Sequence, residues 1–102
     1  MRPVLLLPVI LLSACSPPVM FRVDVDEQVK GGTLTLNGNS ADLMKNLDGN
    51  YWAKWNGSDA DGDIRIVFPD GQTTTCHVGY VTQGMGIQEF EIRHRQCEQV
   101  AT

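Results

Sequence analysis

The sequence has few basic residues and no long apolar run. Its 8 lysine and arginine residues are outnumbered by 12 aspartate and glutamate residues, which gives a formal net charge of −4. A nucleic-acid-binding domain normally carries an excess of basic residues, so no nucleic-acid partner is expected. No apolar stretch reaches the roughly 20 residues that a transmembrane helix needs. With 102 residues, the chain has the length of a single domain.

Recognisable catalytic patterns are also lacking. Cys76 is followed by His77, but neighbours in a strand point to opposite faces, so the two do not form a nucleophile and its base. His77 and His94 would form a metal-binding pair only if they faced each other across a terminal hairpin. No third ligand accompanies them, which favours isolated surface histidines. We therefore expect a protein that is not an enzyme, with no catalytic residues.

The first residues have the pattern of a secretory signal peptide. A basic start, with Arg2, precedes the apolar run 4–12, and small residues follow it at Ser13 and Ala14. This order of a basic, an apolar and a small segment is typical of signal peptides. A buried N-terminal helix or strand is the alternative, which Pro3 and Pro8 disfavour as a regular helix. The pattern predicts a signal peptide over residues 1–14.

The end of this segment, Leu12-Ser13-Ala14-Cys15, resembles the lipobox of bacterial lipoproteins. The resemblance covers only the first sixteen residues. It implies that the thiol of Cys15 receives a diacylglyceryl group, that residues 1–14 are removed and that the new amine is acylated. Ser16 stands where aspartate would signal retention in the inner membrane of many Gram-negative bacteria. The implied location is therefore the outer membrane, with the domain facing the periplasm.

The segment between the acylated cysteine and the domain is short. Residues 15–19 form the acylated N-terminus and tether, and residues 20–102 form the domain. Fully extended, five residues span at most about 18 Å. Pro17 and Pro18 favour a stiff, extended form. We therefore expect the domain to lie close to the membrane surface, held there by its acyl chains because an acidic body is not attracted to anionic lipids.

The remaining sequence is typical of an all-β domain, a small antiparallel sandwich or barrel of about six or seven strands. Alternating apolar and polar residues indicate half-buried strands, separated by turn residues such as Asn37-Gly38, Asp48-Gly49 and Pro69-Asp70-Gly71. The expected strands are 20–26, 33–36, 51–55, 64–68, 73–82 and 87–96, with 41–47 as a weak strand or a loop. Ile64, Ile66 and Phe68 are expected to point inward, as are Cys76, Val78 and Tyr80.

With Cys15 assigned to lipid, Cys76 and Cys97 remain as a pair. A signal peptide implies an oxidising compartment, so we expect a disulfide that joins the last two strands as an antiparallel pair. Two buried free thiols are the alternative. Cys97 lies out of phase with the inward residues Phe90 and Ile92, which requires a bulge near residues 94–96 or a strand that ends before Cys97.

Two features are candidates for binding. On the strand 51–55, Trp52 and Lys54 face away from Tyr51, Ala53 and Trp55, so Trp52 either packs beneath a loop or is exposed as an anchor for a partner.

Met85 lies between two glycines in a predicted loop and is a second candidate for an exposed contact.

The loop carboxylates Asp59, Asp61 and Asp63 are a weak calcium candidate, because the EF-hand spacing is absent and a solvated turn explains them better. No cofactor is expected.

These observations predict a lipid-anchored, non-catalytic binding module that docks against another envelope protein through Trp52, Lys54 and Met85. The length, anchor and disulfide also resemble those of the small β-barrel lipoproteins that inhibit lysozyme. That resemblance is architectural, because their inhibitory loop motif has no match here. It implies inhibition of a lysozyme-type hydrolase as the alternative function.

Overall fold

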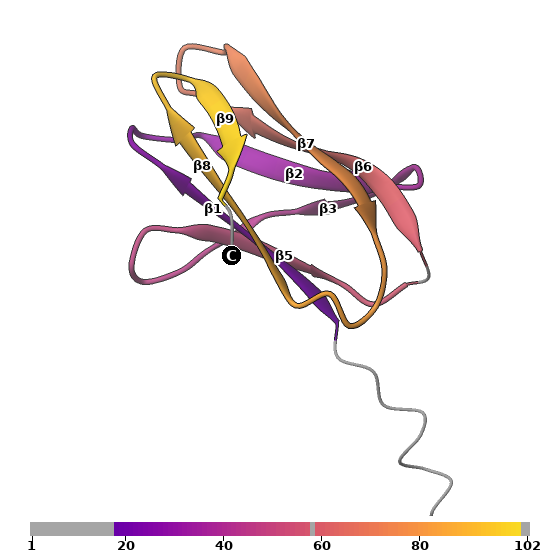
Figure 1. Cartoon of the computed structure of the whole chain (residues 1–102). Coiled ribbons are helices and arrows are strands. Elements are labelled where there is room, and N and C mark those ends of the chain that lie inside the picture. Colours follow the sequence, from indigo (N-terminus) through magenta and orange to yellow (C-terminus); the bar gives the residue numbers. More distant parts are fainter. Residues whose placement is uncertain (1–17, 58, 101–102) are drawn as a thin grey trace, which may run out of the picture.

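The computed structural model describes residues 18–57 and 59–100, which form an all-β sandwich (Figure 1). The predicted signal peptide and Cys15 lie outside the described residues. The strands are β1 (Val19–Val25), β2 (Gly31–Leu36), β3 (Asn39–Asp42), β4 (Met44–Lys45), β5 (Tyr51–Trp55), β6 (Ala60–Val67), β7 (Thr73–Val81), β8 (Ile87–Arg93) and β9 (Gln96–Gln99). The all-β class is confirmed. The strand number exceeds the expected six or seven because two short strands replace the segment 41–47 and the last predicted strand is divided in two.

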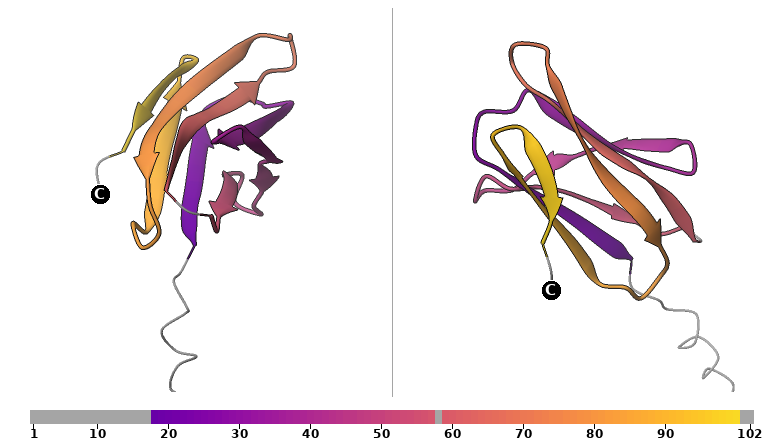
Figure 2. Two further views of the ribbon diagram at one scale, coloured as in Figure 1. Left: turned by 90° about the vertical axis from the view of Figure 1, so that its right-hand side faces the viewer. Right: turned by 45° about the horizontal axis from the view of Figure 1, so that its top comes forward.

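The strands form two sheets. A five-stranded sheet has the order β4-β5-β1-β8-β9, and a four-stranded sheet has the order β3-β2-β6-β7. The chain crosses from one sheet to the other at Leu43, whose backbone N–H donates to the carbonyl oxygen of Gly32 at 2.9 Å. Most neighbouring strands are antiparallel, but β1 and β8 are parallel. Because parallel strands start at the same edge, the start of β1 lies beside the connection between β7 and β8, as both views of Figure 2 show.

The core lies between the sheets and follows the predicted alternation. On β1, Val19, Phe21 and Val23 are fully buried, whereas the residues between them are partly exposed. The inward phase of Ile64, Ile66 and Phe68 is also confirmed. The remaining buried apolar residues are Leu34, Leu36, Ala53, Ala60, Cys76, Val78, Val81, Phe90 and Ile92. Burial of these side chains is the main favourable contribution to folding.

The turns have the chemistry that their sequences predict. Asn37 and Gly38, between β2 and β3, both have positive φ, at 50° and 81°, which the two-residue hairpin turn of type I′ requires. Between β6 and β7, the N–H of Phe68 donates to the carbonyl oxygen of Gln72, and Gly71 has a φ of 89°. These turns set the registers of β2 with β3 and of β6 with β7.

The expected antiparallel pair of terminal strands is wrong. β7 belongs to the four-stranded sheet, whereas β8 belongs to the five-stranded sheet and pairs with β1. The residues between β7 and β8 therefore cross between the sheets instead of closing a hairpin. A hairpin forms between β8 and β9, with His94 and Arg95 at positive φ in its turn. The predicted strand 87–96 is divided by this turn, which also returns Cys97 to the inward phase, opposite Ile92.

The predicted disulfide between Cys76 and Cys97 is present, with the two Cα atoms 5.4 Å apart. It joins β7 to β9, which are the edge strands of different sheets, rather than two paired strands. The crossing at Leu43 lies at the opposite edge of both sheets. The sandwich is thus held by the chain along one side and by the disulfide along the other.

The expected inward position of Tyr80 is also wrong. A register shift between Gly62 and Asp63 leaves Val78 without a partner on β6, and Gly79 has a φ of 73°. This bulge reverses the side-chain phase of the strand, so Tyr80 is 63% exposed and Val81 is buried. A Cβ atom at Gly62 would lie 1.8 Å from the carbonyl oxygen of Thr35, so glycine is required there.

Arg95 joins three loops at the end of the sandwich opposite the start of β1. Its guanidinium donates to the carboxylates of Glu27 and Asp70 and lies 4.2 Å from the centroid of the Phe68 ring. Both carboxylates help to raise the pKa of Arg95, that of Glu27 most. The pKa of Asp70 is lowered, first by the hydrogen bond from the N–H of Gln72 and then by Arg95. The cluster fixes the β8–β9 turn against the core.

Removal of the disulfide is expected to destabilise the domain by about 3 kcal/mol, because the bridge closes a loop of about 22 residues in the unfolded chain. The test is urea unfolding of Cys76→Ala/Cys97→Ala beside the oxidised parent. Reduction of the parent with a phosphine should reproduce the loss and should leave the double variant unchanged. If the double variant has the same unfolding midpoint as the oxidised parent, the disulfide between the sheets does not stabilise the domain.

Asp70→Asn is expected to lower the thermal unfolding midpoint at pH 7. The folded-state pKa of Asp70 lies below its ordinary value of 3.8, so the ionised carboxylate favours the folded state above that value, and this stabilisation disappears as the pH falls through the folded pKa. The difference between parent and variant should therefore shrink as the pH falls below 3.8.

Asp48→Asn is the matched control, because the Asp48 carboxylate also accepts a backbone N–H, from Asn50, but has no ion pair among the described residues. If the difference in thermal unfolding midpoint between the parent and Asp70→Asn persists unchanged at low pH, the ionised carboxylate of Asp70 is not its cause.

Candidate functional site

The outer face of the five-stranded sheet contains an apolar hollow of about 280 Å³. Its lining comes from β1, from β5, from the first residue of β8 and from the turn that follows β4. The lining residues are Met20, Arg22, Asn46, Trp52 and Ile87. Ligand and partner sites in proteins are typically concave and mainly apolar with a few polar groups, and this hollow has that composition.

Strand alternation and register bring these side chains together. Met20 and Arg22 point outward because Val19, Phe21 and Val23 of the same strand fill the core. Two rows of side chains then run across the sheet. Lys54, Met20 and Ile87 form the first row, and Met44, Trp52, Arg22 and Glu89 form the second.

The apolar members of this surface are substantially exposed. Met44 is 57% and Ile87 is 48% exposed, and Trp52 is half-buried in the wall of the hollow. We call Met20, Met44, Trp52 and Ile87 the apolar patch. Clustered exposed apolar side chains on a small domain are typical of a contact surface. Trp52 is thus neither fully buried beneath a loop nor free of neighbours.

The other two predicted contact residues occupy different positions. Lys54 is exposed on β5 and lies beside Met20 in the first row. Met85 lies in the connection between β7 and β8 and is 43% exposed. Its sulfur accepts a hydrogen bond from the backbone N–H of Thr82 at 3.1 Å, so the tip of the connection is folded back on itself. Met85 does not line the hollow.

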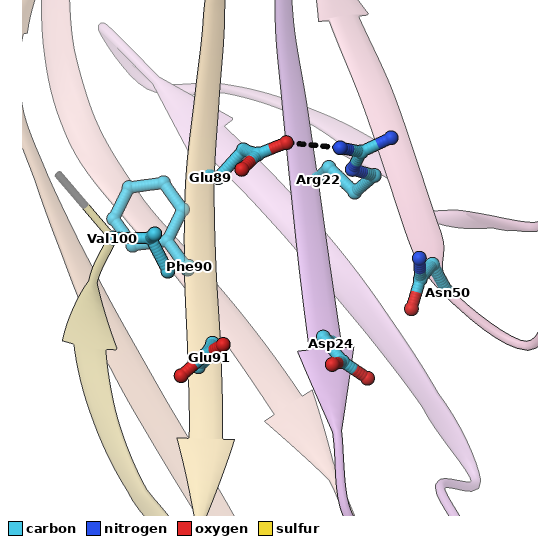
Figure 3. A pocket seen from close by; sticks show the side chains of 7 residues that line it. All are labelled: Arg22, Asp24, Asn50, Glu89, Phe90, Glu91 and Val100. Atoms are coloured by element: carbon cyan, nitrogen blue, oxygen red, sulfur yellow. Dashed lines mark hydrogen bonds and ion pairs between the residues drawn. The ribbon is translucent and has the colours of Figure 1, made fainter. Parts of the chain in front are cut away.

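Charged residues on the same face form ion pairs. Arg22 of β1 pairs with Glu89 of β8, beside a smaller polar hollow of about 130 Å³ (Figure 3). Asp24 and Glu91 follow in the next row, and Arg93 pairs with both. Lys54 has no ion pair among residues 18–57 and 59–100. It is therefore an uncompensated positive charge at the margin of the apolar patch.

The structure does not support a thiol nucleophile at Cys76, because its sulfur is in the disulfide. His77 is exposed on β7, with its Nδ1 atom 3.3 Å from an oxygen of Asp63. His94 lies in the β8–β9 turn. The two histidines do not face each other across a terminal hairpin, because β7 and β8 are in different sheets.

The three carboxylates of the calcium candidate are not gathered around one point. Asp59 accepts hydrogen bonds from the hydroxyl groups of Tyr80 and Thr82, and these lower the pKa of Asp59, that of Thr82 most. The hydrogen bond to Asp59 raises the pKa of Tyr80. Asp61 and Asp63 are exposed on β6, separated by the register shift. In the part of the chain that the structure describes, no three His, Cys, Asp or Glu residues are grouped to hold a metal ion.

Sequence reasoning identified Trp52 and Lys54 but missed Met20, Met44 and Ile87. The alternation of β1 already indicated an outward Met20. Its contact with Ile87 depends on the parallel pairing of β1 with β8, and no local pattern reports that pairing.

Comparisons with known proteins identify no relative: no family model, no curated protein and no solved structure matches the chain. A search of the described residues for membrane-spanning segments finds no helix of sufficient length and hydropathy.

Proposed function

We propose that the protein is a lipoprotein of the bacterial outer membrane, anchored through Cys15, whose sandwich is a non-catalytic binding module on the periplasmic side. The lipobox-like sequence 12–15 supports the anchor and the location. The partner is another envelope protein, and the apolar patch is the surface that binds it. The patch with its hollow is the observation that carries this proposal.

The chemistry of the patch suits a protein contact. Trp52 offers a large apolar surface that is already restrained by its neighbours, so binding costs little side-chain entropy. Met20, Met44 and Ile87 surround it with apolar surface, and methionine side chains adapt to irregular partners. Arg22 and Asn46 supply hydrogen-bond donors at the wall of the hollow. The energetic centre is therefore Trp52.

Cys15→Ser is expected to release the protein from the membrane, because the domain then has no acyl chain to hold it. The measurement is the distribution of the protein between membrane and soluble fractions, together with incorporation of labelled palmitate. Ser16→Ala is the matched control and should remain membrane-bound and labelled. Continued membrane attachment of Cys15→Ser, or an uncleaved and unmodified parent by mass spectrometry, would refute the anchor.

Trp52→Ala is expected to reduce partner capture about tenfold or more, as loss of a central aromatic contact does in protein interfaces. The measurement uses a photo-crosslinking amino acid in place of Met44, at the margin of the patch, in the cells that encode the protein. The same probe in place of Leu47, which is fully exposed outside the hollow, is the matched control. Equal adducts from both probes, or adducts unaffected by Trp52→Ala, would exclude the patch as the binding surface.

The same Trp52→Ala protein also tests the alternative function. Inhibition of lysozyme by the purified parent, lost in the variant, would redirect the proposal toward a hydrolase inhibitor that uses this surface.

A further inference from the structure

The apolar patch begins at one end of the sandwich, the end at which the described chain begins, and extends to the middle of β1, where Trp52 lies opposite Arg22. Met20 is the second residue of β1, and it pairs with Ile87, the first residue of β8. On its other side Met20 pairs with Lys54, next to the last residue of β5. Figure 1 shows the start of β1 and the connection before β8 together at the lower end of the molecule. The cluster of Arg95 lies at the opposite end.

The sequence limits how far this end can lie from an acylated Cys15. Met20 is five positions after Cys15 in the sequence, so their Cα atoms are at most about 18 Å apart. Trp52 lies opposite Arg22, two residues further along β1, which adds about 7 Å. Met44 lies on β4, two strands to the side of β1, and neighbouring strands are about 4.8 Å apart, so the whole patch is within about 30 Å of the anchored residue. A surface that fills the hollow has to be presented at that height above the membrane.

We propose that the partner is a protein embedded in or anchored to the same membrane, which inserts an apolar side chain into the hollow and places a carboxylate beside Lys54. This inference rests on the proposed function and specifies the kind of partner that the patch binds. A protein free in the periplasm is not confined to that height above the membrane. A membrane protein presents its surface at that height.

The shape of the site favours a protein over the bilayer itself. Three of the four patch residues, Met20, Trp52 and Ile87, line the hollow, and Trp52 is half-buried in its wall, whereas side chains that enter a lipid surface protrude from the protein. An acidic residue also lies at this end, because Asp59 precedes β6, whose first residue Ala60 pairs with Val81 at the end of β7. Anionic lipids would repel this carboxylate.

The charge of the site indicates the complementary group. Arg22 is paired with Glu89, whereas Lys54 has no ion pair in the described part of the chain. On a chain with a net charge of −4, an uncompensated lysine beside apolar side chains favours an acidic residue on the partner. An ion pair at the margin of an interface contributes mainly to orientation and association rate.

The test changes the height of the domain above the membrane. A rigid proline-rich spacer of 20 residues, inserted between Pro18 and Val19, would extend about 60 Å and lift the patch away from a membrane partner. A flexible glycine-serine spacer of equal length is the matched control, because it lets the domain return to the membrane surface. Adducts from the photo-crosslinking residue at position 44 are measured in intact cells for the parent and both variants.

The expected result is a loss of the parent's protein adduct of at least tenfold with the rigid spacer, and a smaller decrease with the flexible spacer. Lys54→Glu should weaken the same adduct, and Lys54→Arg should retain it. Undiminished capture with the rigid spacer would overturn the inference in favour of a partner free in the periplasm. Adducts with lipid alone would overturn it in favour of the bilayer, and the absence of any adduct in the parent would overturn it as well.

Membrane fractionation of the same cells separates this inference from the proposed function on which it rests. If the parent is not membrane-bound, the anchor fails and the proposed function fails with it. If all three proteins are membrane-bound and Trp52→Ala lowers capture in each, but the rigid spacer does not, the binding module remains and only the membrane partner is refuted.

Discussion

The parallel pairing of β1 with β8 is the constraint on which the arrangement of this sandwich depends. It joins the first described strand to one near the end of the chain, over the register from Met20 with Ile87 to Val25 with Ile92. No tight turn can form such a pair, because parallel strands require a connection that returns to the starting edge. Here the whole four-stranded sheet lies within that connection. The β1–β8 pair therefore links the two ends of the domain across both sheets, and its inward residues Phe21, Val23, Phe90 and Ile92 are part of the core.

The strands and turns were predictable because their signals are local. Alternation identified the inward phase of Ile64, Ile66 and Phe68, and Asn37-Gly38 predicted a hairpin turn that the structure contains. The pairing of β7 with β8 was predicted wrongly, because adjacency in sequence suggested a hairpin and no residue pattern reports the parallel alternative. The prediction that Tyr80 points inward was wrong for a related reason. Its bulge arises from the fit of β7 against β6, which a single strand's alternation cannot show.

The residues of the candidate site also differ in whether local sequence signals could predict them. Trp52 and Lys54 were predicted as outward residues because that inference needs only the alternation of β5. The hollow itself is a product of three neighbouring strands, so its other apolar walls, Met20 and Ile87, emerged only with the register. The disulfide was predictable as a pair of cysteines, but its position between the edges of two sheets was not. Sequence thus indicated residue types and faces, and the non-local pairing determined which of them form a surface.

The small size of the hollow is compatible with specific binding if the protein and its partner share a membrane. A hollow of about 280 Å³ accepts little more than one or two side chains, which contribute modestly against the translational and rotational freedom lost on association. Two proteins held in one membrane have already lost much of that freedom, which raises their effective concentration. The ion pairs of Arg93 and Arg95 stiffen the opposite end and leave the patch as the apolar part of this face. Under the proposed anchoring at Cys15, a short tether would supply the orientation that a larger interface would otherwise have to provide.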